Sequence, residues 1–166
     1  MSFGSGDYVK LFGDFGATDT FDLCPAVRSV TGPCIEESNC DFEQATVCAF
    51  DGATAKTKVT FLACMDEEPH GVEALAATKA CAPKAGLDYT AIATCFSSDH
   101  GAQLLQAASD KWNKQFPSRA TVPHTFVNGK DVDPEYNLLK QQLCADGSTA
   151  SVCSGVVEAA VKTCSA

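Results

Sequence analysis

The chain has 166 residues, a formal net charge of −9 and a pI near 4.6. A surface this acidic repels phosphate backbones and anionic lipids, which argues against nucleic acid and membrane surfaces as partners. No run of about eighteen apolar residues is present, so we expect no transmembrane segment. The length fits a single domain over residues 1–166, and an apolar content of 45% is enough to form a core.

Ten cysteines are the most prominent motif in the chain, and no two of them form a Cys-x-x-Cys pair. This even number of widely spaced cysteines predicts a framework of disulfides rather than a zinc site or a redox dithiol, so we expect no metal and no cofactor. Spacing does not fix the pairing. Cys34 is close enough to pair with Cys40 or Cys48, and Cys64 with Cys81 or Cys95. The predicted disulfide cysteines are Cys24, Cys34, Cys40, Cys48, Cys64, Cys81, Cys95, Cys144, Cys153 and Cys164.

The cysteine content also indicates an oxidising compartment. Residues 1–7 carry neither a basic nor an apolar segment, so they are not a signal peptide. We expect these residues to be flexible and to mark a processed, truncated or engineered end.

The first half of the chain predicts one strand and then several short helices. Residues 8–16 alternate loosely and are rich in aromatic side chains, which favours a strand. Residues 17–33 show no period and are expected to form a loop that contains Cys24. Apolar spacing predicts a cysteine-rich helical region over residues 34–96, with helices at 35–50, 55–66, 72–82 and 88–95, the last one capped by Asp88.

The second half, over residues 99–146, predicts a helix, a hairpin and another helix. Asp99 is expected to cap a helix that runs from residue 101 to 116. An apolar strand at 121–127 and a second short strand at 130–132 flank Asn128-Gly129, which is a strong hairpin signal. A helix is then expected from Asp133-Pro134 to Cys144, and a final helix at 149–164.

Pro123 interrupts the first strand of this predicted hairpin. Because proline cannot donate to a strand ladder, this position requires a sheet edge, a bulge or a cis bond. A cis-proline that opens a strand faces the substrate in thioredoxin-like folds. The candidate site residues are therefore Val122, Pro123, Asn128 and Gly129.

The other polar residues give weaker predictions. The three histidines, His70, His100 and His124, show no metal-ligand spacing and are expected to be solvated or locally hydrogen-bonded. The acidic pair Glu67-Glu68 is expected to form a solvated helix end.

Three stretches carry a family resemblance: residues 34–48 with their three cysteines, residues 93–105 with Cys95 and His100, and residues 122–130 with the proline-led strand. Together they resemble the gamma-interferon-inducible lysosomal thiol reductase family over roughly residues 8–154. The resemblance implies a helix-rich, disulfide-stapled α/β domain related to thioredoxin, with a small and incomplete sheet. It also implies a lysosomal, secretory or extracellular location.

The chain departs from this family where the family's chemistry occurs. Family enzymes carry a strand that leads into a Cys-x-x-Cys, which reduces substrate disulfides, and this chain has no such unit. Ile35, Glu36 and Glu37 replace the Gln-His-Gly of the family signature, and Cys24 and Cys164 are additions. The missing strand is central in a thioredoxin-like sheet, and one way to supply it is strand addition by another chain.

We therefore predict no catalytic residue. The expected function is a non-catalytic binding or structural module in an oxidising lumen, with another protein chain as its partner. One alternative is a thiol-disulfide oxidoreductase whose catalytic segment is missing from this chain. A weaker alternative is a secreted, disulfide-rich carrier module that resembles the family in spacing alone.

Overall fold

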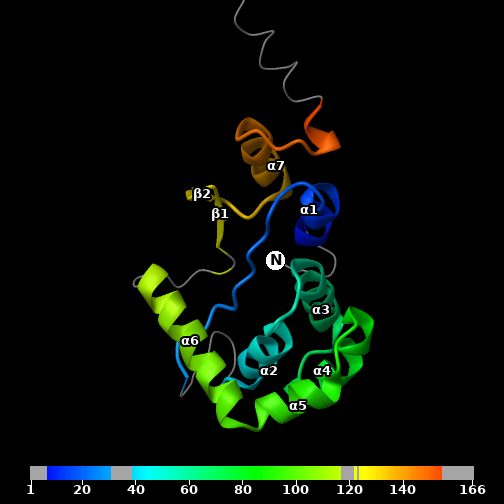
Figure 1. Ribbon diagram of the computed structural model, residues 1–166, viewed down its shortest axis with the longest axis vertical. Coiled ribbons are helices and arrows are strands. Elements are labelled where there is room, and N and C mark those ends of the chain that lie inside the picture. The colour runs from blue at the N-terminus through cyan, green and yellow to red at the C-terminus, as the bar shows by residue number, and fades with distance from the viewer. Residues whose placement is uncertain (1–6, 31–38, 117–121, 123, 155–166) are drawn as a thin grey trace, which may run out of the picture. The chain divides into compact units, whose positions relative to one another are not determined.

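The computed structural model describes residues 7–30, 39–116, 122 and 124–154, and the chain divides into two compact units. The first unit combines Met1–Phe21 with Pro123–Ala166, and the second is continuous over Asp22–Val122. Helices make up most of the described residues, with one small pair of strands (Figure 1). Several predictions fall on positions outside the described residues, namely Cys34, Pro123, Cys164 and the segments 1–6 and 155–164.

The described part of the second unit is built from helices joined by short turns. Its helices are α2 (Asp41–Phe50), α3 (Ala55–Glu67), α4 (Ala74–Cys81), α5 (Tyr89–Phe96) and α6 (Asp99–Gln115), with a short 3₁₀ turn, η1 (Pro83–Ala85). Side-chain caps begin two of these helices. The Thr54 hydroxyl accepts the N–H of Thr57 at 3.2 Å before α3, and the Asp88 carboxylate accepts the N–H of Thr90 at 2.8 Å before α5.

Helix α2 lies at the centre of this unit and packs against α3, α4, α5 and α6. Residues of α2 belong to two apolar clusters. Val47 joins a cluster with Val27, Cys40 and Leu105, whereas the end of α2 joins a larger cluster around Phe61, Cys81 and Ile92. Burial of α2 on several faces explains why a helix of only ten residues is stable here.

Helices occupy much of the described part of residues 34–96, but several helix starts differ from the predicted ones, and α4, for example, begins at Ala74 rather than at residue 72. Residues 39 and 40 are bends, and α2 begins at Asp41 because the Asn39 side chain accepts the N–H of Asp41 at 3.3 Å. Helix α6 begins at Asp99 with Ser98 as the N-cap residue, so Asp99 does not cap the helix. The prediction that Asp88 caps α5 is confirmed.

The first unit contains α1 (Asp7–Phe15), β1 (Thr125–Val127), β2 (Lys130–Val132), α7 (Tyr136–Ala145) and a 3₁₀ turn, η2 (Ser151–Cys153). The strands pair antiparallel, with Thr125 opposite Val132 and Val127 opposite Lys130. Asn128 and Gly129 join them with φ values of +49° and +82°, so the predicted hairpin is confirmed with a type I′ turn. Among the described residues of this unit, the buried ones are Leu11, Phe15, Val127, Leu139, Cys144, Ala150 and Cys153.

The strand predicted over residues 8–16 is wrong, because these residues form helix α1. Tyr8, Leu11 and Phe15 recur at the spacing of one helical face, and Leu11 and Phe15 are buried. Contacts with α7 fix this helix. The hydroxyl of Tyr136 donates to Asp14 at 2.5 Å, and the carboxylate of Asp7 accepts the N–H of Tyr136 at 3.2 Å. A helix is favoured over a strand here because it places the large apolar side chains on one face, where they are buried together.

The described chain is thus helix-rich, with a small two-stranded antiparallel sheet and with disulfides between its elements. The predicted relation to thioredoxin stays a prediction. Within the residues that the structure describes, no helix combines the length and apolarity needed to cross a bilayer.

Candidate binding groove

Three disulfides join described cysteines. Cys48 of α2 bonds to Cys95 of α5, Cys64 of α3 to Cys81 of α4, and Cys144 of α7 to Cys153 of η2. Cys40 is disulfide-bonded as well. Among the pairings left open by spacing, Cys64 with Cys81 is confirmed. Cys34 with Cys48 and Cys64 with Cys95 are wrong, because Cys48 and Cys95 bond to each other.

A groove of about 660 Å³ opens over the Cys48–Cys95 disulfide in the second unit. We call it the Cys48–Cys95 groove. Its lining comes from the end of α2, from α5 with the turn before it, and from the start of α6. The lining residues are Cys48, Ala49, Asp51, Leu87, Asp88, Thr90, Ala91, Ile92, Thr94, Cys95, Ser98 and His100. The volume lies within the range of pockets that hold small ligands or short peptide segments.

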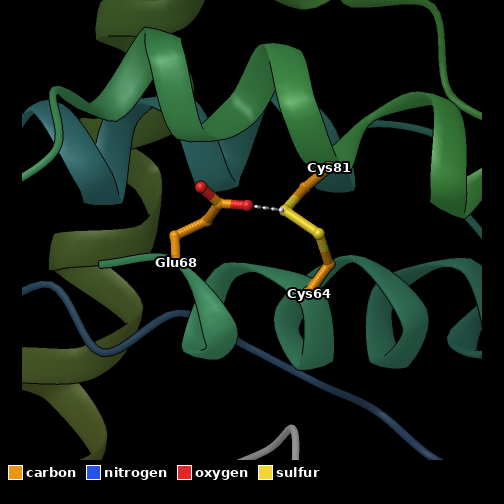
Figure 2. Close-up of side chains that lie close together, drawn as sticks. All are labelled: Cys64, Glu68 and Cys81. Carbon is orange, nitrogen blue, oxygen red and sulfur yellow. Dashed lines mark hydrogen bonds between the residues drawn. A yellow bond between two sulfur atoms is a disulfide. The ribbon is translucent and has the colours of Figure 1, made fainter. Parts of the chain in front are cut away.

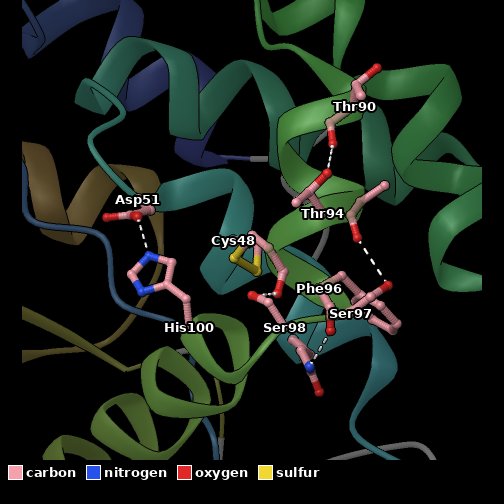
Figure 3. Close-up of a disulfide and its surroundings, with 11 residues drawn as sticks. Cys48, Asp51, Thr90, Thr94, Phe96, Ser97, Ser98 and His100 are labelled. Carbon is pink, nitrogen blue, oxygen red and sulfur yellow. Dashed lines mark hydrogen bonds and ion pairs between the residues drawn. A yellow bond between two sulfur atoms is a disulfide. The ribbon is translucent and has the colours of Figure 1, made fainter.

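His100 and Asp51 form the main polar contact at the rim of this groove. The Nε2 atom of His100 lies 2.7 Å from a carboxylate oxygen of Asp51, and Figure 3 shows the two side chains meeting beside the Cys48 bridge. Both side chains are about half exposed, so the pair contributes little to stability but remains accessible to a ligand. The prediction that His100 is locally hydrogen-bonded is confirmed.

The hydroxyl groups of the groove are held against the backbone. The Thr94 hydroxyl donates to the carbonyl oxygen of Thr90 at 2.8 Å, and the Ser98 hydroxyl donates to that of Cys95 at 2.8 Å (Figure 3). Their oxygen atoms keep lone pairs for a bound donor. Asp88 also lines the groove, but one of its oxygens already accepts the N–H of Thr90.

Two further contacts make the floor of the groove rigid. The Gln44 side chain of α2 donates to the carbonyl oxygen of Phe96 at 2.6 Å, which fixes the end of α5. Gly101 of α6 lies so close that a Cβ atom built there would be 3.2 Å from the Sγ atom of Cys48. The disulfide, the hydrogen bond and this close approach together hold α2, α5 and α6 in one arrangement. A preformed groove binds without first having to order its walls.

Cys24 departs from the prediction that every cysteine is bridged, because it is a free and exposed thiol. Lys111 of α6 donates to its sulfur at 2.7 Å and to Asp22 at 3.3 Å. The hydrogen bond to Cys24 raises the pKa of the Lys111 ammonium, and Asp22 adds to this effect. Burial opposes ionisation of Asp22, but hydrogen bonds from Lys111 and Cys24 hold the pKa of its carboxyl below the usual range. The partners of Cys24 are therefore charged groups rather than a second described cysteine.

The site residues predicted around Pro123 belong to different units: Val122 is the last residue of the second unit, whereas Asn128 and Gly129 lie in the first. Val122 is a half-buried bend residue, and Asn128 and Gly129 form the exposed hairpin turn. Asp146 at the end of α7 accepts hydrogen bonds from Asn128 at 3.2 Å and from Lys130 at 2.8 Å. The hydrogen bond from Lys130, followed by those from Gln142 and Asn128, lowers the pKa of Asp146. The hydrogen bond of Asn128 therefore stabilises the hairpin turn, and Gly129 provides the positive φ that the turn requires.

Reasoning from the sequence missed Asp51 and Glu68. Asp51 follows α2 and is far in sequence from its partner His100, so no local pattern connects them. Glu68 was expected to be solvated, but it is half-buried and one of its oxygens lies 3.8 Å from the Cys81 sulfur. The spacing of Cys64 and Glu68, four residues apart at the end of α3, places both on one helix face and was a usable signal.

Comparison of the chain with protein-family models found no match, and neither curated proteins nor solved structures matched. The resemblance to the thiol reductase family therefore stays a prediction.

Proposed function

We propose that this chain is a non-catalytic module that binds a partner protein in an oxidising lumen. One observation supports the proposal most directly: the described disulfides are structural crosslinks. Five of the six cysteines in the three bridges are buried, namely Cys48, Cys64, Cys81, Cys144 and Cys153. An attacking thiolate must reach a sulfur atom in line with the S–S bond, and burial of this kind opposes that approach.

The described residues also offer no dithiol. A thiol reductase needs an attacking thiolate and a second cysteine that resolves the mixed disulfide. Among the cysteines that the structure describes, only Cys24 is free, and its hydrogen-bond partners are Asp22 and Lys111. The arrangement supports a crosslinked scaffold more than a redox centre.

The Cys48–Cys95 groove is the surface that we assign to partner binding. Among the described residues, its lining includes the carboxylates of Asp51 and Asp88 but no lysine or arginine. Leu87 and Ala91 supply apolar surface beside them. Acidic groups next to apolar surface favour a peptide segment with a basic side chain flanked by apolar residues.

The catalytic part of the proposal is tested with insulin and a dithiol reductant. The full chain is expected to give the same rate of insulin disulfide reduction as the reductant alone. Catalysed reduction of insulin at substoichiometric amounts of the chain would reject the proposal and favour a thiol reductase.

The binding part is tested with a library of short peptides and two matched variants. Thr94→Arg places a long cation in the groove, whereas Thr60→Arg does the same on the exposed surface of α3. Both threonine hydroxyls donate to the carbonyl four residues earlier, so the two changes remove the same local contact. We expect basic-apolar peptides to bind wild type and Thr60→Arg alike, and Thr94→Arg at least tenfold more weakly. Equal binding to both variants would remove the groove from the proposal.

A further inference from the structure

The ends of α3 and α4 bring two cysteines and one carboxylate together. Cys64 lies in α3, Glu68 immediately follows that helix, and Cys81 is the last residue of α4. Their ligand atoms, two Sγ atoms and one carboxylate oxygen, all lie within 4.8 Å of one another. Figure 2 shows the Glu68 carboxylate directed at the Cys64–Cys81 bridge.

In the bridged form, Glu68 and Cys81 lie close together without a hydrogen bond between them. The distance from the Glu68 oxygen to the Cys81 sulfur is 3.8 Å. A bridged sulfur carries no hydrogen, so a carboxylate beside it gains no hydrogen bond from it. In the dithiol form, by contrast, the Cys81 thiol would donate to Glu68. Ionisation of both thiols would then place three negative charges together, which a cation would stabilise.

We propose that the dithiol form of Cys64 and Cys81, together with Glu68, binds a Zn²⁺ ion. Thiolate and carboxylate are both ordinary zinc ligands, and three protein ligands leave a fourth position for water. Bond lengths of about 2.3 Å to sulfur and about 2.0 Å to oxygen place such ligands about 3.5 Å apart in a tetrahedral site. The Glu68 oxygen is therefore already close to its ligand position, and the two sulfurs have only to separate when their bond opens.

The chemistry balances with a dithiol as the reductant. The dithiol gives two electrons and two protons to the Cys64–Cys81 bond, becomes a disulfide itself, and leaves two thiols on the chain. Zn²⁺ then displaces the two thiol protons and is held by two thiolates and the Glu68 carboxylate. Burial opposes this reduction in the folded chain, so the dithiol form available to zinc is chiefly the one that exists before the bridge first closes. This site goes beyond the proposed binding function and does not depend on it.

The two cysteines are shielded from solvent. Cys81 is fully buried and Cys64 is 6% exposed, within the apolar cluster that also holds Phe61 and Ile92. Glu68 is half-buried and lies at the edge of this cluster, which gives the ion a path from solvent. Zinc held in this way would keep the thiols from pairing with other cysteines.

The test uses the full chain, reduced with a phosphine that is then removed under argon. Co²⁺ serves as the probe because its thiolate complexes absorb in the near ultraviolet and Zn²⁺ displaces it. We expect the double variant Cys64→Ser/Cys81→Ser to bind one Co²⁺ fewer than the reduced wild-type chain. The double variant Cys48→Ser/Cys95→Ser should retain this ion. Glu68→Gln should weaken the binding of this ion at least tenfold, whereas the change at its exposed neighbour, Glu67→Gln, should leave it unchanged.

A second measurement does not depend on substitutions. Zn²⁺ should slow alkylation of Cys64 and Cys81 in the reduced chain at least tenfold, relative to Cys48 and Cys95, as read from peptide masses. Equal protection of both pairs would overturn the proposal, as would equal Co²⁺ binding by Glu68→Gln and Glu67→Gln. A reduced chain whose helical circular dichroism is lost and is not restored by Zn²⁺ would overturn it as well.

Discussion

The Cα atom of Gly101 faces the sulfur of Cys48, so that a Cβ atom at this position would lie 3.2 Å from Sγ and would collide with the carbonyl oxygen of Cys95. The backbone of α6 thus approaches the Cys48–Cys95 disulfide more closely than any residue with a side chain allows. Gly101 is buried within a helix, where glycine otherwise costs stability relative to alanine. Its role is therefore to permit this approach.

Gly101→Ala should destabilise the chain by about 2 kcal/mol, because the added methyl group must push α6 away from the bridge. Gly13→Ala is the matched control, since Gly13 is also helical and nothing lies within 4 Å of its Cβ position. This control should be neutral or stabilise by about 0.5–1 kcal/mol. Denaturant unfolding measures the free energy of unfolding of both variants, and hydrogen exchange of α6 and α1 shows where each change acts. A Gly101→Ala chain as stable as Gly13→Ala would show that α6 does not pack against the bridge.

The two disulfides of the second unit should differ in the stability that they provide. Cys48 and Cys95 are 47 residues apart, whereas Cys64 and Cys81 are 17 apart. Loop-closure entropy then predicts losses of about 4 and about 3 kcal/mol when each pair is replaced by serine. Urea unfolding of the two double variants, monitored by the fluorescence of Trp112, measures the difference. A larger loss from the Cys64–Cys81 pair would mean that packing rather than chain entropy dominates.

Hydrogen bonding at the hairpin should depend on pH through Asp146. The hydrogen bond from Lys130 lowers the pKa of this carboxyl in the folded chain. A lowered folded pKa means that the contact stabilises the fold above the ordinary aspartate pKa and is lost as the pH falls through the folded pKa. Carboxyl titration by NMR should give Asp146 a midpoint below that of an ordinary aspartate. Lys130→Met should raise this midpoint, and an unchanged midpoint would show that Lys130 does not contact it.

Cys24 should react with iodoacetamide in the absence of reductant, because it is exposed and free. The cysteines of the three described bridges should remain unmodified under the same conditions. Peptide mass spectrometry under non-reducing conditions reads both results at once. Cys24 recovered in a disulfide-linked peptide would restore the prediction from the sequence that it is bridged.

Local patterns predicted the elements that depend on local contacts. Asn128-Gly129 specified its turn because both residues tolerate positive φ, and Asp88 specified a helix start because its carboxylate caps the N–H of Thr90. Residues 8–16 were predicted as a strand because alternation and helical period compete over so few residues. Burial of Leu11 and Phe15 beside α7 decides between the two, and no local pattern contains that information.

The groove and the zinc-type cluster depend on pairs that are distant in the sequence. Asp51 meets His100 across 49 residues, and Cys48 meets Cys95 across 47. Spacing left several cysteine pairings open because it does not contain the helix packing that chooses among them. Spacing offered Cys81 as one of two partners for Cys64, and the four-residue interval from Cys64 to Glu68 was a usable signal, but neither predicted the contact between Glu68 and the Cys81 sulfur.

The Asn128-Gly129 sequence of the hairpin turn also makes this turn prone to chemical ageing. Asparagine before glycine loses ammonia readily, since the glycine N–H is unhindered and can attack the side-chain amide. At Asn128 this ageing reaction would exchange the donor that now reaches Asp146 for a second carboxylate. An attraction at the tip of the hairpin would then become a repulsion, and old molecules would differ from new ones at this turn.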